Sequence, residues 1–140
     1  PYTYVEASLT IEGVTFPRVG LRKKGFIGSQ DSFRPSLKVK LDYFDKKENI
    51  SGLDNLTLNN NKQETSLMSQ FMGYHIFNEV GSPGPRCAYA KVTVNGKNLG
   101  VYCHVETVRK PLLKREFGSD KGTLYEGTVV DFHEDWEQSF

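Results

Sequence analysis

Basic residues bracket a polar, glycine-bearing loop near the start of the chain, an arrangement that suits phosphate binding. Gly25 and Gly28 lie at the start of this loop, followed by Ser29. Backbone N–H groups of such a loop can point at phosphate oxygens. Lys38 and Lys40 follow on the next predicted strand, where an ammonium group can neutralise a phosphate. By themselves, these residues favour a plainer interpretation, namely solvated charges on a half-exposed strand.

A second group with possible chemistry lies near the end of the sequence. Its side chains are Asp131, His133, Glu134 and Asp135. Hard cations take oxygen ligands of this kind. An acidic surface loop is the preferred interpretation, so no metal site is predicted in this chain. No spacing of Ser, His and Asp, or of Cys and His, indicates a catalytic pair.

Several strands must position the loop and the lysines. Apolar and polar residues alternate over residues 5–11, and a second strand is predicted over residues 14–22. Pro17 places that second strand at a sheet edge or at a bulge. In the third strand, residues 37–41, the apolar side chains face one side and the two lysines face the other. A short fourth strand is predicted at residues 56–58.

A long amphipathic helix is predicted over residues 62–80. Asn61, with Glu64 three residues later, fits a variant of the capping box at its start. Gly81 supplies the stop. Gln70 stands at mid-helix, where a carboxylate would pair with a phosphate-binding lysine. The apolar stripe expected to pack the helix on the sheet comprises Leu67, Met68, Phe71, Met72, His75, Ile76 and Val80.

A β-hairpin with an Asn-Gly turn follows the helix. With a two-residue loop, Cys87 lies opposite His104, and the Cys87 and Cys103 sulfurs point to opposite faces of the sheet. We therefore predict that the two cysteines form no disulfide. A one-residue bulge in the hairpin would reverse this parity.

The order of elements predicts the fold class. A short helix at residues 110–117 and a last strand at residues 122–126 follow the hairpin, so the chain is α+β, with a mostly antiparallel sheet and one main helix packed on it. Its 140 residues include 18 basic and 17 acidic side chains, and this balance argues against nucleic acid as a partner. No apolar run approaches the roughly 20 residues of a membrane span.

Short motifs occur in a defined order between residues 19 and 127. They include Arg22-Lys-Lys-Gly, Arg34-Pro-Ser-Leu-Lys-Val-Lys, Leu56-Thr-Leu-Asn, Tyr74-His-Ile-Phe, Gly81-Ser-Pro-Gly-Pro-Arg, Val94-Asn-Gly, Gly100-Val-Tyr, Glu106-Thr-Val-Arg and Gly122-Thr-Leu-Tyr-Glu-Gly. In this order they resemble the CotH kinase family, named for a spore-coat protein. The chain departs from the family pattern at Glu64, Arg109 and Glu126, and at Ser69-Gln70, where many members carry Arg-Glu.

The resemblance implies part of an atypical kinase small lobe that uses ATP and Mg²⁺ or Mn²⁺ to phosphorylate Ser or Thr on a coat or surface protein. It makes Lys38 the first candidate for the phosphate-binding lysine and Lys40 the second. Arg22 and Lys24 would flank the nucleotide loop, and Glu106 would lie near the lobe junction. The residues expected to bind the nucleotide are Lys38, Lys40, Arg22, Lys24, Gly25, Gly28, Ser29 and Glu106.

Residues 1–140 are expected to form the N-terminal part of one such domain, since both ends look like cuts in a longer protein. The catalytic carboxylates are expected after Phe140, so the chain alone is predicted to be inactive. The alternative is a non-catalytic CotH-fold module for adhesion or coat assembly, and a β-rich sugar-binding domain is a weaker one. Family analogy suggests a spore, envelope or secreted setting, although no targeting signal is present.

Overall fold

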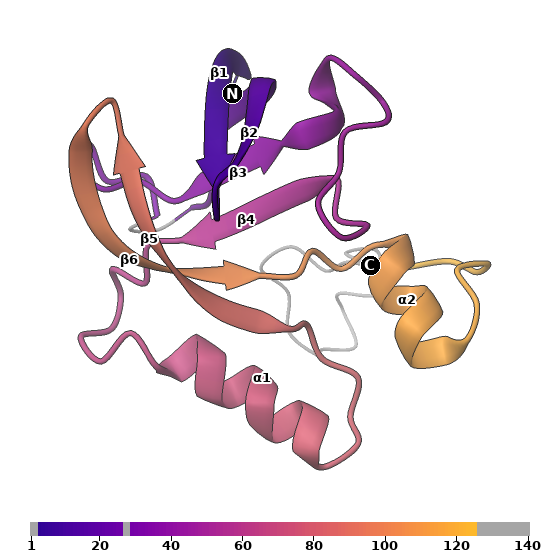
Figure 1. The fold of residues 1–140 in the computed structure, drawn as a ribbon. Coiled ribbons are helices and arrows are strands. Elements are labelled where there is room, and N and C mark those ends of the chain that lie inside the picture. Colours follow the sequence, from indigo (N-terminus) through magenta and orange to yellow (C-terminus); the bar gives the residue numbers. More distant parts are fainter. Residues whose placement is uncertain (1–2, 27–28, 126–140) are drawn as a thin grey trace, which may run out of the picture.

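The computed structural model describes residues 3–26 and 29–125, which form one curled sheet and two α-helices (Figure 1). The predicted α+β class with a mostly antiparallel sheet is confirmed. The elements, in chain order, are β1 (Val5–Ile11), β2 (Val14–Lys23), β3 (Leu37–Lys40), the short 3₁₀-helix η1 (Leu41–Tyr43), β4 (Asn55–Asn59), α1 (Ser69–Glu79), β5 (Cys87–Val94), β6 (Lys97–Val105) and α2 (Lys110–Phe117).

Neighbours in sequence pair directly in the sheet, except that β6 rather than β5 lies against β4. The strand order is β1-β2-β3-β4-β6-β5, and every pairing is antiparallel. The hairpins β1-β2 and β5-β6 therefore form the two ends of the sheet. Both hairpins rise on the side away from α1 in Figure 1, which gives the sheet its curl.

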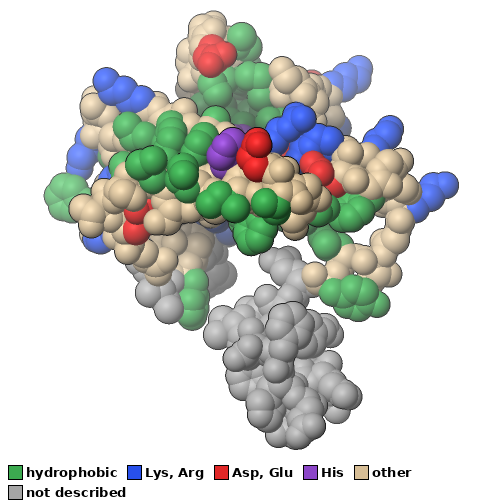
Figure 2. Space-filling view, turned by 90° about the horizontal axis from the view of Figure 1, so that it is seen from below, with side chains coloured by type: hydrophobic (Ala, Val, Ile, Leu, Met, Phe, Trp, Pro, Cys, Tyr) green, Lys and Arg blue, Asp and Glu red, His purple; other side chains and the backbone are tan. Residues whose placement is uncertain are grey.

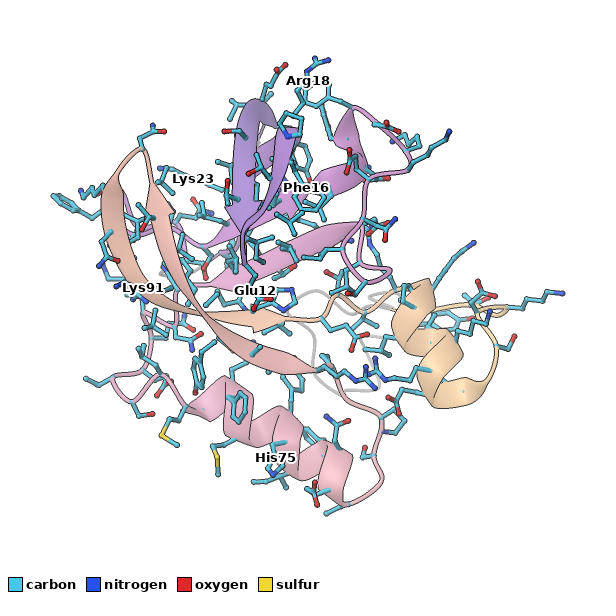
Figure 3. The ribbon with its side chains drawn as sticks, in the orientation of Figure 1. Glu12, Phe16, Arg18, Lys23, His75 and Lys91 are labelled. Atoms are coloured by element: carbon cyan, nitrogen blue, oxygen red, sulfur yellow. The ribbon has the colours of Figure 1, made fainter. Side chains whose placement is uncertain are left out.

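The two faces of the sheet differ in chemistry because side chains alternate along each strand. One face lies inside the curl and carries the core. In Figure 3 Phe16 points into this interior, whereas Arg18 points out to solvent. The other face carries the polar side chains of β2, β3 and β4, and α1 packs on this face against β5. The buried core residues of the first face are Phe16, Val19, Val39, Leu41 and Leu56 in one cluster and Leu37, Leu58 and Tyr102 in a second.

Strand β2 is interrupted by a bulge at its proline. Ala7 pairs with Val19 and Leu9 pairs with Phe16, so two residues of β2 oppose one residue of β1 between these pairs. Pro17, which has no N–H to donate, lies within this bulge. Because β2 is an interior strand, the bulge accommodates the proline, and of the two predicted possibilities this one is confirmed.

Helix α1 begins at Ser69 rather than at the predicted residue 62. Asn61 and Leu67 have positive φ angles of 49° and 60°, which a continuous helix does not allow. The predicted capping box is therefore wrong, and the Asn61 side chain instead donates to the Leu67 carbonyl at 3.2 Å. The Glu64 carboxylate accepts the Ser69 N–H at 3.2 Å, so this residue supports the start of α1 from the preceding turn.

The apolar stripe of α1 does not anchor the helix on the sheet as predicted. Phe71 stacks on Tyr89 of β5 with ring centroids 5.1 Å apart, but no residue of the helix is buried. Figure 2, seen from the side of α1, shows hydrophobic side chains at the surface. Helical periodicity identifies an apolar stripe but not the neighbour that covers it. The exposed members of the stripe are Met68, Met72, His75, Ile76 and Val80.

The β5-β6 hairpin turns at the predicted Asn-Gly pair, but its register shifts by one residue near Leu99. This bulge places Cys87 opposite Val105 and Cys103 opposite Tyr89, so both cysteines lie on the same face of the sheet. Both thiols are free, as predicted. The predicted reason, that the two sulfurs point to opposite faces of the sheet, is wrong because of the bulge.

The last described elements agree only in part with the sequence pattern. Helix α2 has the predicted bounds, with Pro111 in its first turn. The strand predicted at residues 122–126 is wrong over residues 122–125, and Glu126 lies outside the described residues. A strand forms only where a neighbouring strand accepts and donates its backbone hydrogen bonds, and the residue types of a segment do not supply that neighbour. Within residues 3–26 and 29–125, no helix is long and apolar enough to cross a membrane.

Candidate functional site

Positive side chains gather on the polar face of the sheet, where β2, β3 and β4 lie side by side. Arg22 pairs with Lys38 across the β2-β3 ladder, and Lys38 pairs with Thr57 of β4. Directly paired residues point to the same face, so the guanidinium and ammonium groups lie on one side of the sheet. Lys24 follows on the same side of the chain after β2. We call Arg22, Lys24 and Lys38 the basic cluster.

The three positive side chains of the basic cluster repel one another, and burial together with this repulsion lowers the pKa values of its lysines. Like charges directly opposite each other in a ladder destabilise a sheet. Burial lowers the pKa of Lys38, and the charges of Arg109 and Arg22 lower it further. Burial also lowers the pKa of Lys24, together with the charges of Lys38 and Arg22. An anion bound here would favour the charged form of both lysines, so the cluster fits an anionic ligand.

Lys24 reaches from the end of β2 toward α1. Its Nζ donates to Asn59 Oδ1 at 2.6 Å, and Asn59 Nδ2 donates to Gln70 Oε1 at 2.7 Å. We call Lys24, Asn59 and Gln70 the amide relay. Beside the relay lies a cavity of about 320 Å³, the polar pocket, between the loop, the end of β4 and the start of α1. Its lining also includes Ser29, Asn61, Lys62, Ser69 and the carboxylate of Glu64.

The loop over residues 25–36 is anchored by its own side chains. Asp31 accepts two consecutive backbone N–H groups from the loop, each at 2.8 Å, and its carboxylate pairs with Lys62. The Ser36 N–H donates to the Ser29 carbonyl at 2.7 Å. These N–H groups are therefore engaged within the protein. Phosphate binding at this place would rest on the basic cluster and on the other N–H groups of the loop.

Arg34 ties the same loop to β6. Its guanidinium donates to the backbone carbonyls of Leu99, at 2.8 Å, and of Val101, and it lies 4.8 Å from the centre of the Tyr102 ring. The Asn60 side chain donates to the carbonyl of Arg34 at 2.7 Å. These contacts join the loop to β6 and to the end of β4, immediately before β3 begins. They therefore help to fix the position of β3, which carries Lys38.

Of the three loop residues predicted to bind the nucleotide, the structure describes Gly25 and Ser29. Gly25 has a φ of 98°, and a Cβ at this position would lie 2.2 Å from the Ser29 Cβ. Only glycine fits there without a shift of the backbone. Gly25 therefore shapes the turn that brings Ser29 to the polar pocket. Gly28 lies outside the described residues.

Lys40 is less well placed than Lys38 for a phosphate. It pairs with Gly20 of β2 and Asn55 of β4, two residues further from the loop along β3. Its ammonium lies 3.8 Å from an oxygen of Asp42, so part of its charge is already balanced. Among the two lysines of β3, Lys38 is the one that belongs to the basic cluster.

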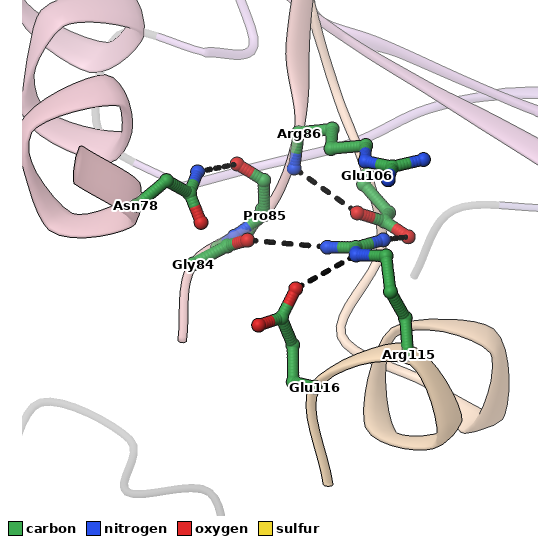
Figure 4. Close-up of polar contacts among 7 residues, drawn as sticks. All are labelled: Asn78, Gly84, Pro85, Arg86, Glu106, Arg115 and Glu116. Atoms are coloured by element: carbon green, nitrogen blue, oxygen red, sulfur yellow. Dashed lines mark hydrogen bonds and ion pairs between the residues drawn. The ribbon is translucent and has the colours of Figure 1, made fainter. Parts of the chain in front are cut away.

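Glu106 is buried at the end of β6, where it holds α2 to the sheet (Figure 4). Its carboxylate accepts Arg115 Nη1 at 2.5 Å and the Arg86 N–H at 3.0 Å. Arg115 also donates to the Gly84 carbonyl at 3.3 Å. Burial works to raise the pKa of Glu106, but the bond from Arg115 and the Arg86 N–H outweigh it, so the pKa lies below its usual value. Both carboxylate oxygens are therefore engaged in structural contacts.

Two residues of the amide relay, Asn59 and Gln70, are absent from the sites predicted by sequence. The Lys24 N–H donates to the Ser36 carbonyl at 2.9 Å, which continues the ladder of β2 and β3 beyond its last pair. Extending the observed registers of β2 with β3 and of β3 with β4 by one residue places Lys24 and Asn59 in the same row. The sequence analysis predicted the strands but not how they pair, so it could not place these two residues together. Gln70 was predicted to lie at mid-helix, but α1 begins at Ser69, so Gln70 lies in the first turn. Its contact with Asn59 depends on where α1 docks, and no local pattern reports that.

The acidic group at residues 131–135 lies outside the described part of the chain. Within residues 3–26 and 29–125, no three His, Cys, Asp or Glu side chains are placed to hold a metal ion. The divalent cation implied by the resemblance to kinases therefore has no ligands assigned in this structure.

Comparison with known protein families decides the family assignment. A sequence profile of the family described as "CotH kinase protein" matches residues 21–140. The chain belongs to the CotH family. The resemblance inferred from the ordered motifs is thereby confirmed, and the matched segment includes the basic cluster and the amide relay.

Two curated relatives of this CotH-family chain come from Bacillus subtilis (strain 168). The chain is 28% identical over 102 residues to "Inner spore coat protein H-like protein", covering 68% of the chain and 33% of the relative. It is 30% identical over 82 residues to "Inner spore coat protein H", covering 59% of the chain and 23% of the relative. The chain thus spans a third or less of the length of these relatives.

Proposed function

We propose that this chain is the nucleotide-binding part of a CotH-type protein kinase and that its basic cluster binds the phosphates of ATP. The observation that carries the proposal is the direct pairing of Arg22 with Lys38, next to Lys24. Positive groups opposed in this way destabilise a sheet, and an anion bound beside them would favour their charged forms. The description of the family, CotH kinase protein, supports the same assignment.

The arrangement of elements also supports a kinase small lobe. A helix stands beside the phosphate-facing side of an antiparallel sheet, and α1 contacts Lys24 through the amide relay. In phosphoryl transfer such a lysine holds the phosphates, and a positioned helix orients the lysine. Gln70 of α1 is neutral, so the charge of Lys24 is kept for the ligand.

The proposed reaction transfers the terminal phosphoryl group of ATP to a Ser or Thr hydroxyl on a coat or surface protein. Lys24, Lys38 and Arg22 bind the phosphates and balance their negative charge, which is the larger part of catalysis in this class of reaction. Mg²⁺ or Mn²⁺ would supply further charge neutralisation when bound. The carboxylates for that ion and for the acceptor hydroxyl are not among the residues assigned in this chain.

Binding of ATP and of tripolyphosphate to the chain, measured by calorimetry, tests the phosphate site. Lys38→Met should weaken both affinities about tenfold, since a charge-assisted hydrogen bond is lost. Lys91→Met is the matched control, because Lys91 is an exposed lysine on β5 (Figure 3). Equal affinities for wild type, Lys38→Met and Lys91→Met would overturn the proposed site.

Incubation of the full-length protein with labelled ATP and Mg²⁺ or Mn²⁺ tests the reaction. We expect labelling of a coat-protein substrate by the wild type, strongly reduced labelling by Lys38→Met, and none by the 140-residue chain alone. Full activity of Lys38→Met would remove that lysine from the mechanism. Labelling by the chain alone would show that the catalytic carboxylates have been misplaced.

A non-catalytic role in coat assembly is the second candidate. The exposed apolar side of α1, which includes Met72 and Ile76, favours it, as do relatives described as spore coat proteins. On this alternative, Met72→Asp and Ile76→Asp should abolish association with an isolated coat protein, and Lys38→Met should leave it unchanged. A full-length protein that is inactive with both metals and several substrates would favour this role.

A further inference from the structure

The amide relay joins three elements that are far apart in sequence. Lys24 follows β2, Asn59 ends β4 and Gln70 lies in the first turn of α1. The bond lengths of 2.6 and 2.7 Å are those of good hydrogen bonds, and the first donor is charged. The position of the Lys24 ammonium group therefore depends directly on where α1 begins.

The relay orients Lys24 without neutralising it. Asn59 and Gln70 carry no charge, so neither balances the charge of the ammonium group. Two other lysines near the site differ in this respect, since Lys40 lies beside Asp42 and Lys62 pairs with Asp31. An ammonium group has three N–H donors, and Asn59 accepts one of them. A phosphate oxygen can therefore bind Lys24 while the relay stays intact.

The polar pocket offers the space for that phosphate. Its volume of about 320 Å³ is roughly ten times the ~30 Å³ that one water molecule occupies in the liquid. Lys24 and Gln70 are both in its lining, together with Ser69 at the start of α1. The Glu64 carboxylate, also in the lining, already accepts the Ser69 N–H at the start of α1, so a phosphate in this pocket would bind through Lys24 rather than through the helix N-terminus.

Helix α1 has few other tight contacts with the sheet. None of its residues is buried, and Phe71 makes its ring contact with β5. The bond of the Ser69 N–H to Glu64 and the bond of the Tyr89 hydroxyl to the Leu67 carbonyl also hold the start of the helix, so the relay is one of a few polar contacts at the first turn. Loss of the relay bond should be visible in the helix itself, even when no ligand is present.

We propose that the polar pocket receives a phosphate group on Lys24, and that Asn59 and Gln70 are positioning residues that couple this phosphate to the first turn of α1. The proposal rests on the proposed function, because it names the place of one phosphate of the bound nucleotide. It adds that α1 and the phosphate stabilise each other through the relay. Coupling of this kind is reciprocal, so each partner must respond to the other.

Hydrogen exchange without ligand tests the relay. The Met72 N–H donates to the Met68 carbonyl at 2.8 Å and reports on the first turn of α1. Gln70→Leu should speed exchange at Met72 about tenfold, because the helix loses its bond to Asn59. Gln70→Glu keeps an oxygen acceptor and should retain slow exchange. Asn78→Leu, on the same helix, is the control and should leave Met72 unchanged.

Tripolyphosphate binding by calorimetry tests the coupling. Gln70→Leu should bind the probe about tenfold more weakly than wild type, and the probe should slow exchange at Met72 in wild type but not in Lys24→Met. Unchanged affinity and unchanged exchange in Gln70→Leu would overturn the coupling and leave the proposed function standing. A wild type that binds no tripolyphosphate would overturn both, and exchange at Met72 would then still show whether the relay holds α1.

Discussion

Lys38 is placed where its charge opposes the stability of the sheet. Its ammonium is partly buried and pairs directly with Arg22 across the ladder. Replacing it by Met should remove this repulsion and stabilise the ligand-free chain by about 0.5–1 kcal/mol, which raises the Tm by a few degrees. Thermal unfolding without ligand measures the change. A Tm equal to or below that of wild type would show that no strain is stored at this position.

Asp31 makes the anchoring of the loop depend on pH. The bond from Lys62, helped by the Arg34 and Phe33 N–H groups, lowers the pKa of Asp31 from 3.8 to about 2. A carboxyl group with a lowered folded pKa stabilises the fold above its unfolded pKa and loses this effect as pH falls through the folded value. We expect exchange at the Arg34 N–H to quicken between pH 4 and pH 2 beyond its intrinsic rate. Asp31→Asn should show no such step.

At the scale of elements, α1 is held by the stacking of Phe71 on Tyr89, by the amide relay and by hydrogen bonds near both of its ends. Phe71→Ala should lower the free energy of unfolding by about 1–2 kcal/mol, because it removes the ring that stacks on Tyr89. Met72→Ala should change it by less than about 0.5 kcal/mol, since this side chain is exposed. Urea unfolding of the two variants checks the difference. The reverse order would mean that the other side of the helix faces the sheet.

At the scale of the whole molecule, the pair of Glu106 and Arg115 joins β6, α2 and the segment that precedes β5. Arg115→Met should lower the free energy of unfolding by about 3 kcal/mol, because it leaves a buried carboxylate without its cation. Adding Glu106→Met should recover part of the loss. Urea unfolding measures both, and a loss below 0.5 kcal/mol in the single variant would show that the pair does not hold α2.

Local patterns along the sequence were enough for most of the elements and for the family. Alternation predicted β1 and β3, the strands β2 and β4 were predicted from their residue types, the Asn-Gly pair predicted the turn between β5 and β6, and Pro111 marked the first turn of α2. Each of these signals depends on a few consecutive residues, through side-chain direction or preferred dihedral angles. The order of the short motifs likewise placed the chain in the CotH family. The assignment of Lys38 as the phosphate-binding lysine stays a prediction.

Contacts between distant residues decided the rest. The turns at Asn61 and Leu67 delay the start of α1, and the shift near Leu99 moves both cysteines to one face. Neither follows from periodicity, because each depends on which partner the backbone meets after folding. The bond from Asn59 to Gln70 is of the same kind. A sequence specifies which face of a strand or helix is apolar or polar, and only tertiary packing determines what that face contacts.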